Sequence, residues 1–344
     1  MGDLDAAAFA STPGGAVAAR AGAELREYGF RLPLQLKQMG DAQNCRHRSG
    51  WRYVMERLRS YHTLEGILLD DFVERSFQHS YCRQEWREPW VGIFHHPPGL
   101  PSWLDPSAPP DAIFGLPEFR NSLPYLRGAI ALSNHLGRWL ESRLGCPVLV
   151  VRHPTEAASA PFSLEAFEAE PRRRMVQVGW YGRNQRAIYQ VPTLPSFRKI
   201  HLLQDRPWVR EAIARTDALS PLRGTAHVGQ VEVVQEISNE EYDRLLSASM
   251  IFNQYWDVSA SNTIIEAIAR GTPILVNRHV ALEEYLGLDY PLYYDAMADV
   301  EHLLRDGGAI AAASEHIAAL DKSWMSAESF ARSVAQFAAE VAND

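Results

Sequence analysis

The stretch Ser259-Ala-Ser-Asn-Thr-Ile-Ile-Glu-Ala-Ile-Ala-Arg-Gly-Thr-Pro-Ile-Leu-Val-Asn277 decides the fold that this sequence predicts. Its first residues are polar and include several good helix N-caps, so a helix is expected to begin within residues 259–263. Gly271 is placed to end this helix, and Pro273 cannot continue it. The apolar run 274–276 indicates a buried strand. A helix that leads directly into a buried strand is typical of an α/β fold.

The start of this helix is a candidate binding site for an anion. Around Ser261, Asn262 and Thr263, backbone N–H groups are expected to point out of the turn, and such a helix start attracts phosphate above all. Glu266 follows about one turn inside the helix. A carboxylate beside a phosphate site suits a ligand that carries both phosphate and hydroxyl groups, such as a nucleotide sugar.

Length, charge and cysteine content bound the class of protein. The chain has 344 residues, which favours two domains over one core. A formal net charge of −8 argues against nucleic acid as the main partner. Cys45, Cys82 and Cys146 are an odd, widely spaced set without a metal-ligand pattern, which favours a reducing cytoplasm. We expect no integral membrane segment, because no apolar run approaches the roughly 20 residues of a span, and no signal peptide is apparent.

Strands and helices alternate along most of the chain, which predicts parallel sheets covered on both faces. The first half predicts strands at 30–37, 66–69, 90–94, 128–132 and 147–151, with helices from Ser49 and over 136–144. The second half predicts strands at 175–180, 226–234, 250–253 and 274–276, with helices at 197–203, 239–249 and near 330–341.

The domain organisation follows from these elements. We predict a flexible N-terminal arm at 1–28, a Rossmann-like domain at 29–165, a nucleotide-sugar-binding domain at 166–312, and C-terminal helices at 313–344. The aperiodic stretch 155–172 is the predicted linker. Two α/β domains of this kind are expected to face a central cleft at the carboxyl ends of their sheets, where such folds bind ligands.

Residues 175–300 resemble the donor-binding domain of GT-B glycosyltransferases, in particular the bacterial family 4, or group 1, enzymes. The family signature E-A-(I/M)-A-x-G-T-P-(I/V) reads Glu266-Ala-Ile-Ala-Arg-Gly-Thr-Pro-Ile274 here. Ala281-Leu-Glu-Glu-Tyr-Leu-Gly287 follows where the family has an acidic segment. The resemblance implies a GT-B fold in which Glu266 binds the ribose hydroxyls and the preceding turn binds the diphosphate. It covers the second domain well and the first only in outline. The resemblance also implies that the first domain is the acceptor side and that the helices at 313–344 pack back across it.

One position departs from the family pattern. Family members usually carry a second glutamate, eight positions before the first, that contacts the donor sugar. Val258 stands at that position here, with Asp257 beside it. Either Asp257 replaces the glutamate or the sugar is held differently.

The loop Gly182-Arg-Asn-Gln-Arg186 follows a predicted strand of the second domain. Family members place cations near this point, against the leaving diphosphate. No metal signature is visible in the sequence, so cationic side chains are expected to stabilise that charge. Arg183 is the first candidate, because the guanidinium fork suits phosphate, and Arg186 or Lys199 is the second. The alternative is a solvated basic loop.

In the first domain, His47-Arg-Ser-Gly-Trp51 resembles the glycine loop that faces the donor phosphates in GT-B enzymes. Gly50 would let backbone approach the donor closely, although Ser49 could equally be a simple helix N-cap.

Candidates for the catalytic base lie at predicted strand ends. His95 and His96 follow one strand and precede two prolines, and a neutral imidazole there can accept a proton from an acceptor hydroxyl. Asp71 follows another strand and is the rival base.

These observations predict a metal-independent glycosyltransferase without a cofactor, which moves a sugar from a nucleotide diphosphate sugar, UDP-sugar favoured, to an acceptor hydroxyl. A GT-B nucleotide-sugar epimerase and a non-catalytic binding or scaffold protein are the alternatives. The donor sugar, the acceptor, retention against inversion, and the oligomeric state stay open.

Overall fold

The structure is a computed structural model that describes residues 34–36, 51–78, 84–104, 109–219 and 230–342. The chain divides into two compact units. The first unit comprises Met1–His95, Ile113–Glu156 and Ser323–Asp344, and the second comprises His96–Ala112 and Ala157–Lys322. The predicted arm at 1–28 lies outside the described residues.

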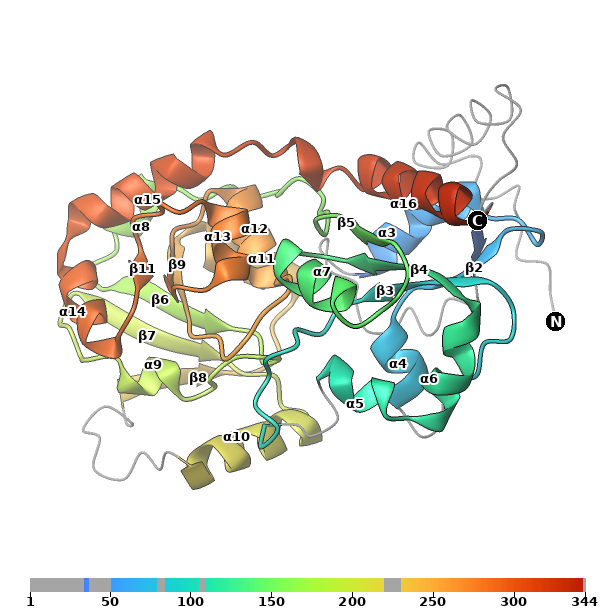
Figure 1. Cartoon of the computed structure of the whole chain (residues 1–344). Helices are drawn as coiled ribbons and strands as arrows, with labels where there is room; N and C mark the ends of the chain where they lie inside the picture. Colours follow the sequence, from blue (N-terminus) through green and yellow to red (C-terminus); the bar gives the residue numbers. More distant parts are fainter. Residues whose placement is uncertain (1–33, 37–50, 79–83, 105–108, 220–229, 343–344) are drawn as a thin grey trace. The chain divides into compact units, whose positions relative to one another are not determined.

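The first unit contains a five-stranded parallel sheet in the order β1-β2-β3-β4-β5 (Figure 1). Its strands are β1 (Leu34–Leu36), β2 (Ile67–Asp70), β3 (Trp90–Phe94), β4 (Leu126–Ala131) and β5 (Val148–Val150). Its helices are α3 (Trp51–Leu58), η2 (Arg59–Tyr61), α4 (Val73–Gln78), α6 (Pro117–Ser122), η3 (Leu123–Tyr125), α7 (Asn134–Glu141), η5 (Ser323–Met325) and α16 (Ala327–Val341), and α5 (Pro110–Phe114) begins in the second unit.

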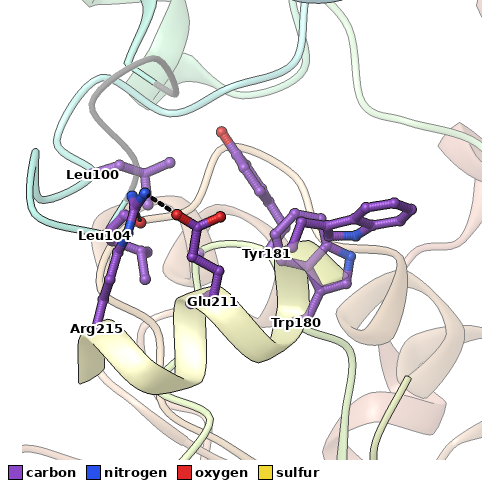
Figure 2. A pocket seen from close by; sticks show the side chains of 9 residues that line it. Leu100, Leu104, Trp180, Tyr181, Glu211 and Arg215 are labelled. Carbon is purple, nitrogen blue, oxygen red and sulfur yellow. Dashed lines mark hydrogen bonds and ion pairs between the residues drawn. The ribbon is translucent and has the colours of Figure 1, made fainter. Parts of the chain in front are cut away.

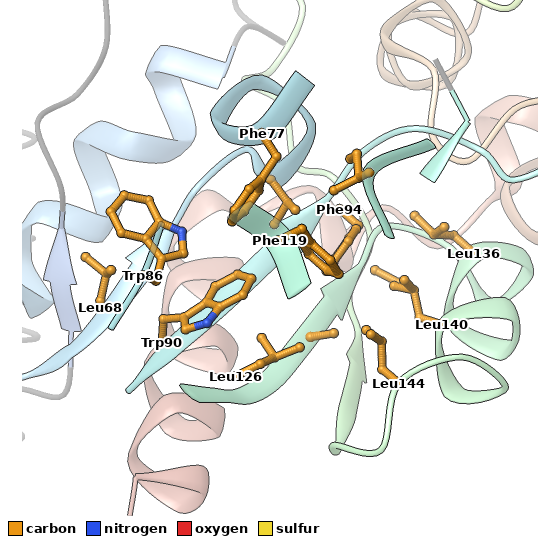
Figure 3. Packing of buried hydrophobic residues seen from close by; sticks show 14 residues of the cluster. Leu68, Phe77, Trp86, Trp90, Phe94, Phe119, Leu126, Leu136, Leu140 and Leu144 are labelled. Atoms are coloured by element: carbon orange, nitrogen blue, oxygen red, sulfur yellow. The ribbon is translucent and has the colours of Figure 1, made fainter. Parts of the chain in front are cut away.

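An aromatic core lies on one face of this sheet, under α4, α6 and α7 (Figure 3). Phe77 makes edge-to-face contacts with Trp86 and Phe119, an arrangement that suits the ring quadrupoles. The other face is covered by α3 and α16. Gly128 of β4 makes close approach possible there, because a Cβ at this position would lie 2.6 Å from the Phe337 ring of α16.

The second unit contains a six-stranded parallel sheet in the order β11-β10-β9-β6-β7-β8. Its strands are β6 (Arg173–Val178), β7 (Phe197–Leu202), β8 (Val231–Val234), β9 (Ser249–Asn253), β10 (Ile274–Asn277) and β11 (Tyr293–Tyr294). Its helices are α8 (Leu164–Glu168), α9 (Ala187–Gln190), α10 (Pro207–Leu219), α11 (Asn239–Ser247), α12 (Asn262–Arg270), α13 (Val280–Leu286), α14 (Met297–Arg305) and α15 (Gly307–Ala319). In Figure 1, α11, α12 and α13 lie on one face of the sheet.

The deciding stretch folds as predicted. Ser261 is the N-cap of α12, and Gly271 ends the helix in the left-handed conformation at φ 77°. The Thr272 N–H donates to the Ala267 carbonyl at 2.9 Å, which satisfies one of the last helical carbonyls. β10 follows at once and lies between β9 and β11 in the sheet. The predicted α/β class with two parallel sheets is therefore confirmed.

One local prediction is wrong. The helix expected at 197–203 is strand β7, because its backbone pairs with β6 on one side and β8 on the other. The stretch 155–172, the predicted linker, contains the short helix α8. Ser163 caps α8 by accepting a hydrogen bond from the Ala166 N–H at 3.1 Å. In the part of the chain that the structure describes, no helix has the length and apolar character of a membrane span.

The buried His201 of β7 predicts a loss of stability in acid. Burial, and then the charge of Arg186, lower the pKa of His201 from 6.5 to about 4. As the pH falls below 6.5, His201 therefore binds a proton in the unfolded chain but stays neutral in the folded chain. We expect the free energy of unfolding to fall by about 2 kcal/mol from pH 7 to pH 5 because of His201 alone.

Urea denaturation of the wild type and of His201→Gln at both pH values measures this contribution. The variant is expected to lose about 2 kcal/mol less than the wild type over this interval. Asp70, whose pKa burial raises to about 6, has the opposite pH dependence, but its contribution cancels in the difference between the two proteins. Equal losses in both proteins would show that His201 titrates normally.

Candidate functional site

The N-terminus of α12 holds a guanidinium group. Arg183 Nη2 donates to Ser261 Oγ at 2.8 Å and to Thr263 Oγ1 at 3.0 Å. Ser261 is the N-cap residue, but its side chain accepts no capping hydrogen bond from the first turn. Its hydroxyl instead contacts Arg183 and the Tyr255 hydroxyl, which lies 2.7 Å away. A fixed positive charge is thus added to the partial positive charge of a helix start, which is an environment for an anion.

The loop after β6 positions Arg183. Gly179 adopts φ +80°, and a Cβ there would lie 2.7 Å from Arg183 Cζ, so a glycine leaves room for the guanidinium. The Tyr181 carbonyl accepts from Arg183 Nη1 at 2.9 Å, and the Tyr255 ring lies 4.9 Å below Arg183 Cζ. These contacts fix the guanidinium plane, which sets the direction of its remaining N–H bonds.

The charge of Arg183 is buried without a counterion from the described part of the chain. The residue is only 8% exposed, and its Nε has no hydrogen-bond partner. Its other guanidinium contacts are with neutral oxygens of Tyr181, Ser261 and Thr263. A buried cation is costly unless an anion pairs with it. An anionic ligand at the start of α12 would supply that pair.

Glu266 lies on the same helix and is 4% exposed. The Tyr242 hydroxyl donates to Glu266 Oε2 at 2.8 Å. Burial, and then the Glu266 charge, hold the pKa of Tyr242 well above its ordinary value, so the phenol stays a donor. This contact orients a buried carboxylate on the residue that lies about one helical turn after Thr263.

The other two predicted cations have partners away from α12. Arg186 makes two hydrogen bonds to Asp217, at 2.7 Å and 2.6 Å, and this pairing raises the pKa of Arg186. Lys199 lies within β7, where Nζ donates to the Val191 carbonyl at 2.7 Å and burial lowers its pKa to about 8. Of the three candidates, Arg183 is the one that the structure places against Ser261 and Thr263. Asn262 is exposed at the first turn of the helix.

Asp257 bonds to protein groups through both carboxylate oxygens. Oδ1 accepts from the Val258 N–H at 2.7 Å and from His279 Nε2 at 2.8 Å, and Oδ2 accepts from the Gly99 N–H. His279 Nδ1 accepts from the Ala281 N–H, so the neutral imidazole carries its proton on Nε2. Asp257 therefore ties the segment around Gly99 to the loop after β9. Val258 itself is a buried apolar residue.

Replacing Asp257 tests this positioning role. Asp257→Ala is expected to lower the unfolding free energy by about 1–3 kcal/mol, because the N–H groups of the buried Val258 and of Gly99 lose their acceptor. The affinities for UDP and for UDP-glucose, measured by calorimetry, should change by the same factor.

Gly99→Ala is the matched variant, since its Cβ would lie 2.7 Å from Asp257 Oδ2. The destabilisation of the double variant should be smaller than the sum of the two single effects, because both changes break one contact. A loss confined to UDP-glucose would instead assign Asp257 to the sugar, as the sequence allows.

The first unit brings two predicted catalytic residues together. His95 Nε2 lies 2.9 Å from the Asp71 carbonyl oxygen, which can only accept, so the proton is on Nε2 in the neutral ring. The Asp71 carboxylate accepts from Trp51 Nε1 at 2.8 Å and pairs with Arg75 at 3.0 Å. The His95 ring contacts Trp51 edge to face, with centroids 4.5 Å apart. His95 Nδ1 is thus the basic nitrogen of the neutral tautomer, whereas Asp71 is engaged with cationic and indole donors.

His96 belongs to the second unit, where its ring lies 4.5 Å from that of Tyr181. Gly50, predicted to face the donor, lies outside the described residues. Sequence reasoning missed Tyr242 and Tyr255, the residues that orient Glu266 and Arg183. An isolated tyrosine carries no local signal for such a role.

The sequence matches no protein-family model, and no curated protein is significantly similar to it. Solved structures are similar in fold. Sucrose-phosphate synthase from Thermosynechococcus elongatus has a TM-score of 0.60 at 13% identity, over 96% of this chain and 94% of that chain. A UDP-forming α,α-trehalose-phosphate synthase from Burkholderia xenovorans has a TM-score of 0.52 at 8% identity, over 85% and 78%. Anabaena HepE, solved with UDP and glucose, has a TM-score of 0.51 at 10% identity, over 95% and 80%.

These neighbours are GT-B glycosyltransferases, and this chain has the GT-B fold that the sequence predicts. At such low identities the likeness concerns the fold, so the function depends on the residues of the site.

Proposed function

We propose that this protein is a glycosyltransferase that uses a nucleotide diphosphate sugar, with UDP-sugar favoured, and an acceptor hydroxyl. The observation that carries the proposal is the buried guanidinium of Arg183, held at the start of α12 by Ser261 and Thr263. A diphosphate would supply the missing counterion, and the nearby Glu266 carboxylate would accept from ribose hydroxyls. Two of the similar solved structures, the UDP-forming trehalose-phosphate synthase and HepE with UDP and glucose, support the same donor class.

In this reaction the bond between the sugar C1 and the diphosphate oxygen breaks, and a bond from C1 to the acceptor oxygen forms. Negative charge develops on the departing diphosphate, where Arg183 and the α12 N–H groups would stabilise it. The acceptor proton passes to a base, for which His95, His96 and Asp71 are the candidates. No cofactor or metal takes part in the proposed reaction. A cytoplasmic location belongs to the same proposal.

Release of nucleoside diphosphate tests the activity. The protein is incubated with UDP-glucose, UDP-galactose, UDP-N-acetylglucosamine and GDP-mannose, each with and without a hydroxyl-bearing acceptor mixture, and free UDP or GDP is measured. Release that depends on the acceptor supports a transferase. Interconversion of two UDP-sugars would identify an epimerase. Tight binding without turnover would favour the non-catalytic alternative, for which the apolar Val258 is the supporting observation.

Glu266 tests the nucleotide site separately. Glu266→Ala is expected to weaken UDP binding by about 1–3 kcal/mol, because buried hydroxyls of the ligand lose an acceptor. Isothermal titration calorimetry measures the change. Tyr242→Phe is the matched control, since it removes the donor to Glu266 and keeps the carboxylate. A smaller loss is expected for this variant, and unchanged affinity in Glu266→Ala would remove the ribose assignment.

A further inference from the structure

Two partly open cavities lie along α10 in the second unit. The first has a volume of about 110 Å³, and the segment Leu100–Leu104, the loop after β6 and the first turns of α10 line it (Figure 2). The second has a volume of about 180 Å³, and Trp103, Trp256 and the end of α10 line it. Each has room for several water molecules, since one needs about 10–15 Å³, and therefore for a ligand ring.

The two cavities are neighbours, because consecutive residues of the same segments line them. Leu104 lines the first and Trp103 the second. On α10, Arg215 lines the first and Thr216 the second. Side chains of consecutive helical residues point about 100° apart, so the two cavities lie on adjacent sides of α10.

The first cavity combines aromatic rings with a neutralised ion pair. Trp208 is 52% exposed, so its indole is presented to solvent rather than packed in a core. Trp180 and Tyr181 add two more rings, which lie beside Glu211 in Figure 2. Arg215 pairs with Glu211 at 2.5 Å and donates to the Leu104 carbonyl at 2.8 Å. This wall offers aromatic faces and planar polar groups with no net charge.

The second cavity repeats this chemistry with amides. Trp256, 36% exposed, meets Trp103 edge to face at 5.4 Å between centroids. Asn184, Gln190 and Gln254 contribute carboxamide groups to the lining. Asn184 Nδ2 donates to Gln254 Oε1 at 2.7 Å, which fixes the orientation of both amides.

From these two cavities we infer a binding site for a neutral oligosaccharide along α10, with one sugar ring in each cavity. The C–H faces of a sugar pack on aromatic rings, while its hydroxyls need donors and acceptors in fixed positions, and both cavities offer this combination. The paired charges of Glu211 and Arg215 favour a ligand without net charge. Gly182 and Asn184 of this site flank Arg183 in the sequence, but the inference does not require the proposed transferase activity.

Ligand-observed NMR and calorimetry with glucose, maltose and maltotriose, and with the galacto- and manno-configured analogues, test the inference on the whole chain. Within at least one series we expect the disaccharide to bind roughly tenfold more tightly than the monosaccharide, because the second ring occupies the second cavity. Trp208→Ala and Trp256→Ala should each reduce disaccharide affinity by roughly tenfold and leave UDP affinity unchanged. Leu288→Ala is the control, since Leu288 is 67% exposed and lines neither cavity.

The inference is overturned if none of the saccharides binds or if both tryptophan variants bind them as the wild type does. It is also overturned if uridine or UDP displaces the saccharide from the wild type, because the cavities would then hold a nucleobase. UDP binding by Glu266→Ala tests the nucleotide site alone, because Glu266 lines neither cavity. The proposed glycosyltransferase function and the proposed oligosaccharide site can therefore be refuted independently of each other.

Discussion

Replacing Arg183 by alanine is expected to lower the turnover number for sugar transfer by about 10²–10³-fold, the usual loss when one preorganised donor to a developing negative charge is removed. Affinity for UDP should fall by about 1.5–3 kcal/mol, since hydrogen bonds to charged groups are lost. Nucleoside diphosphate release and calorimetry measure the two effects, and circular dichroism checks that the variant is folded.

Two further variants sharpen this test. Arg183→Lys keeps the charge and loses the planar fork that reaches both Ser261 and Thr263, so an intermediate loss is expected. Arg186→Ala breaks the pair with Asp217 and should leave UDP affinity unchanged. If the effects of Arg183→Ala and Arg186→Ala are reversed, the leaving group contacts Arg186 instead.

Replacing Arg270 by alanine is expected to destabilise the protein by about 3–5 kcal/mol, because it leaves a buried carboxylate without its partner. The Arg270 side chain is fully buried at the end of α12 and pairs with Asp243 of α11, whose side chain is 9% exposed. Arg270 also donates to the Ala160 carbonyl at 3.1 Å, and Ser159 donates to Asp243 at 2.9 Å. Urea denaturation measures the free energy of unfolding.

The double variant Arg270→Met/Asp243→Leu is the control for this pair. It removes both charges at similar volume, so most of the lost stability should return. A double variant as unstable as Arg270→Ala would show that the contacts to Ala160 and Ser159, rather than the uncompensated charge, hold this region.

Local chemistry made α12 and β10 predictable from sequence. Gly271 supplies the positive φ that ends the helix, and Pro273 prevents its continuation, so both boundaries follow from residues within the stretch. β7 was mispredicted because its six residues, which include Arg198 and Lys199, show neither a clear helical nor a clear strand periodicity of apolar side chains. Its identity as a strand comes from pairing with β6 and β8, which lie elsewhere in the chain. α10 was not predicted, since its buried positions are Val209, Ala212 and Thr216, a weakly apolar face.

In the candidate site, too, the residues that are close in sequence were predicted and their distant partners were not. The family-like signature pointed to Glu266, Ser261 and Thr263, which adjoin in sequence. The partners that orient them lie far along the chain: Tyr242 is 24 positions from Glu266, and Arg183 is 78 positions from Ser261. The contacts of Asp257 with Gly99, 158 positions away, likewise decide whether its carboxylate can meet a sugar, and no local pattern encodes them.

The covering of the first sheet by α16 bears on how the chain folds during synthesis. Phe330, Val334 and Phe337 are buried on this helix, which packs against α3 and β4. The strands of that sheet leave the ribosome within the first 150 residues, yet the helix that covers one of their faces is made after the whole second unit. An N-terminal domain usually completes its core before the next domain emerges from the ribosome. The first unit of this protein cannot do so, because part of its core is contributed by α16. The apolar face that α16 covers in the first unit therefore stays exposed until this helix has been synthesised.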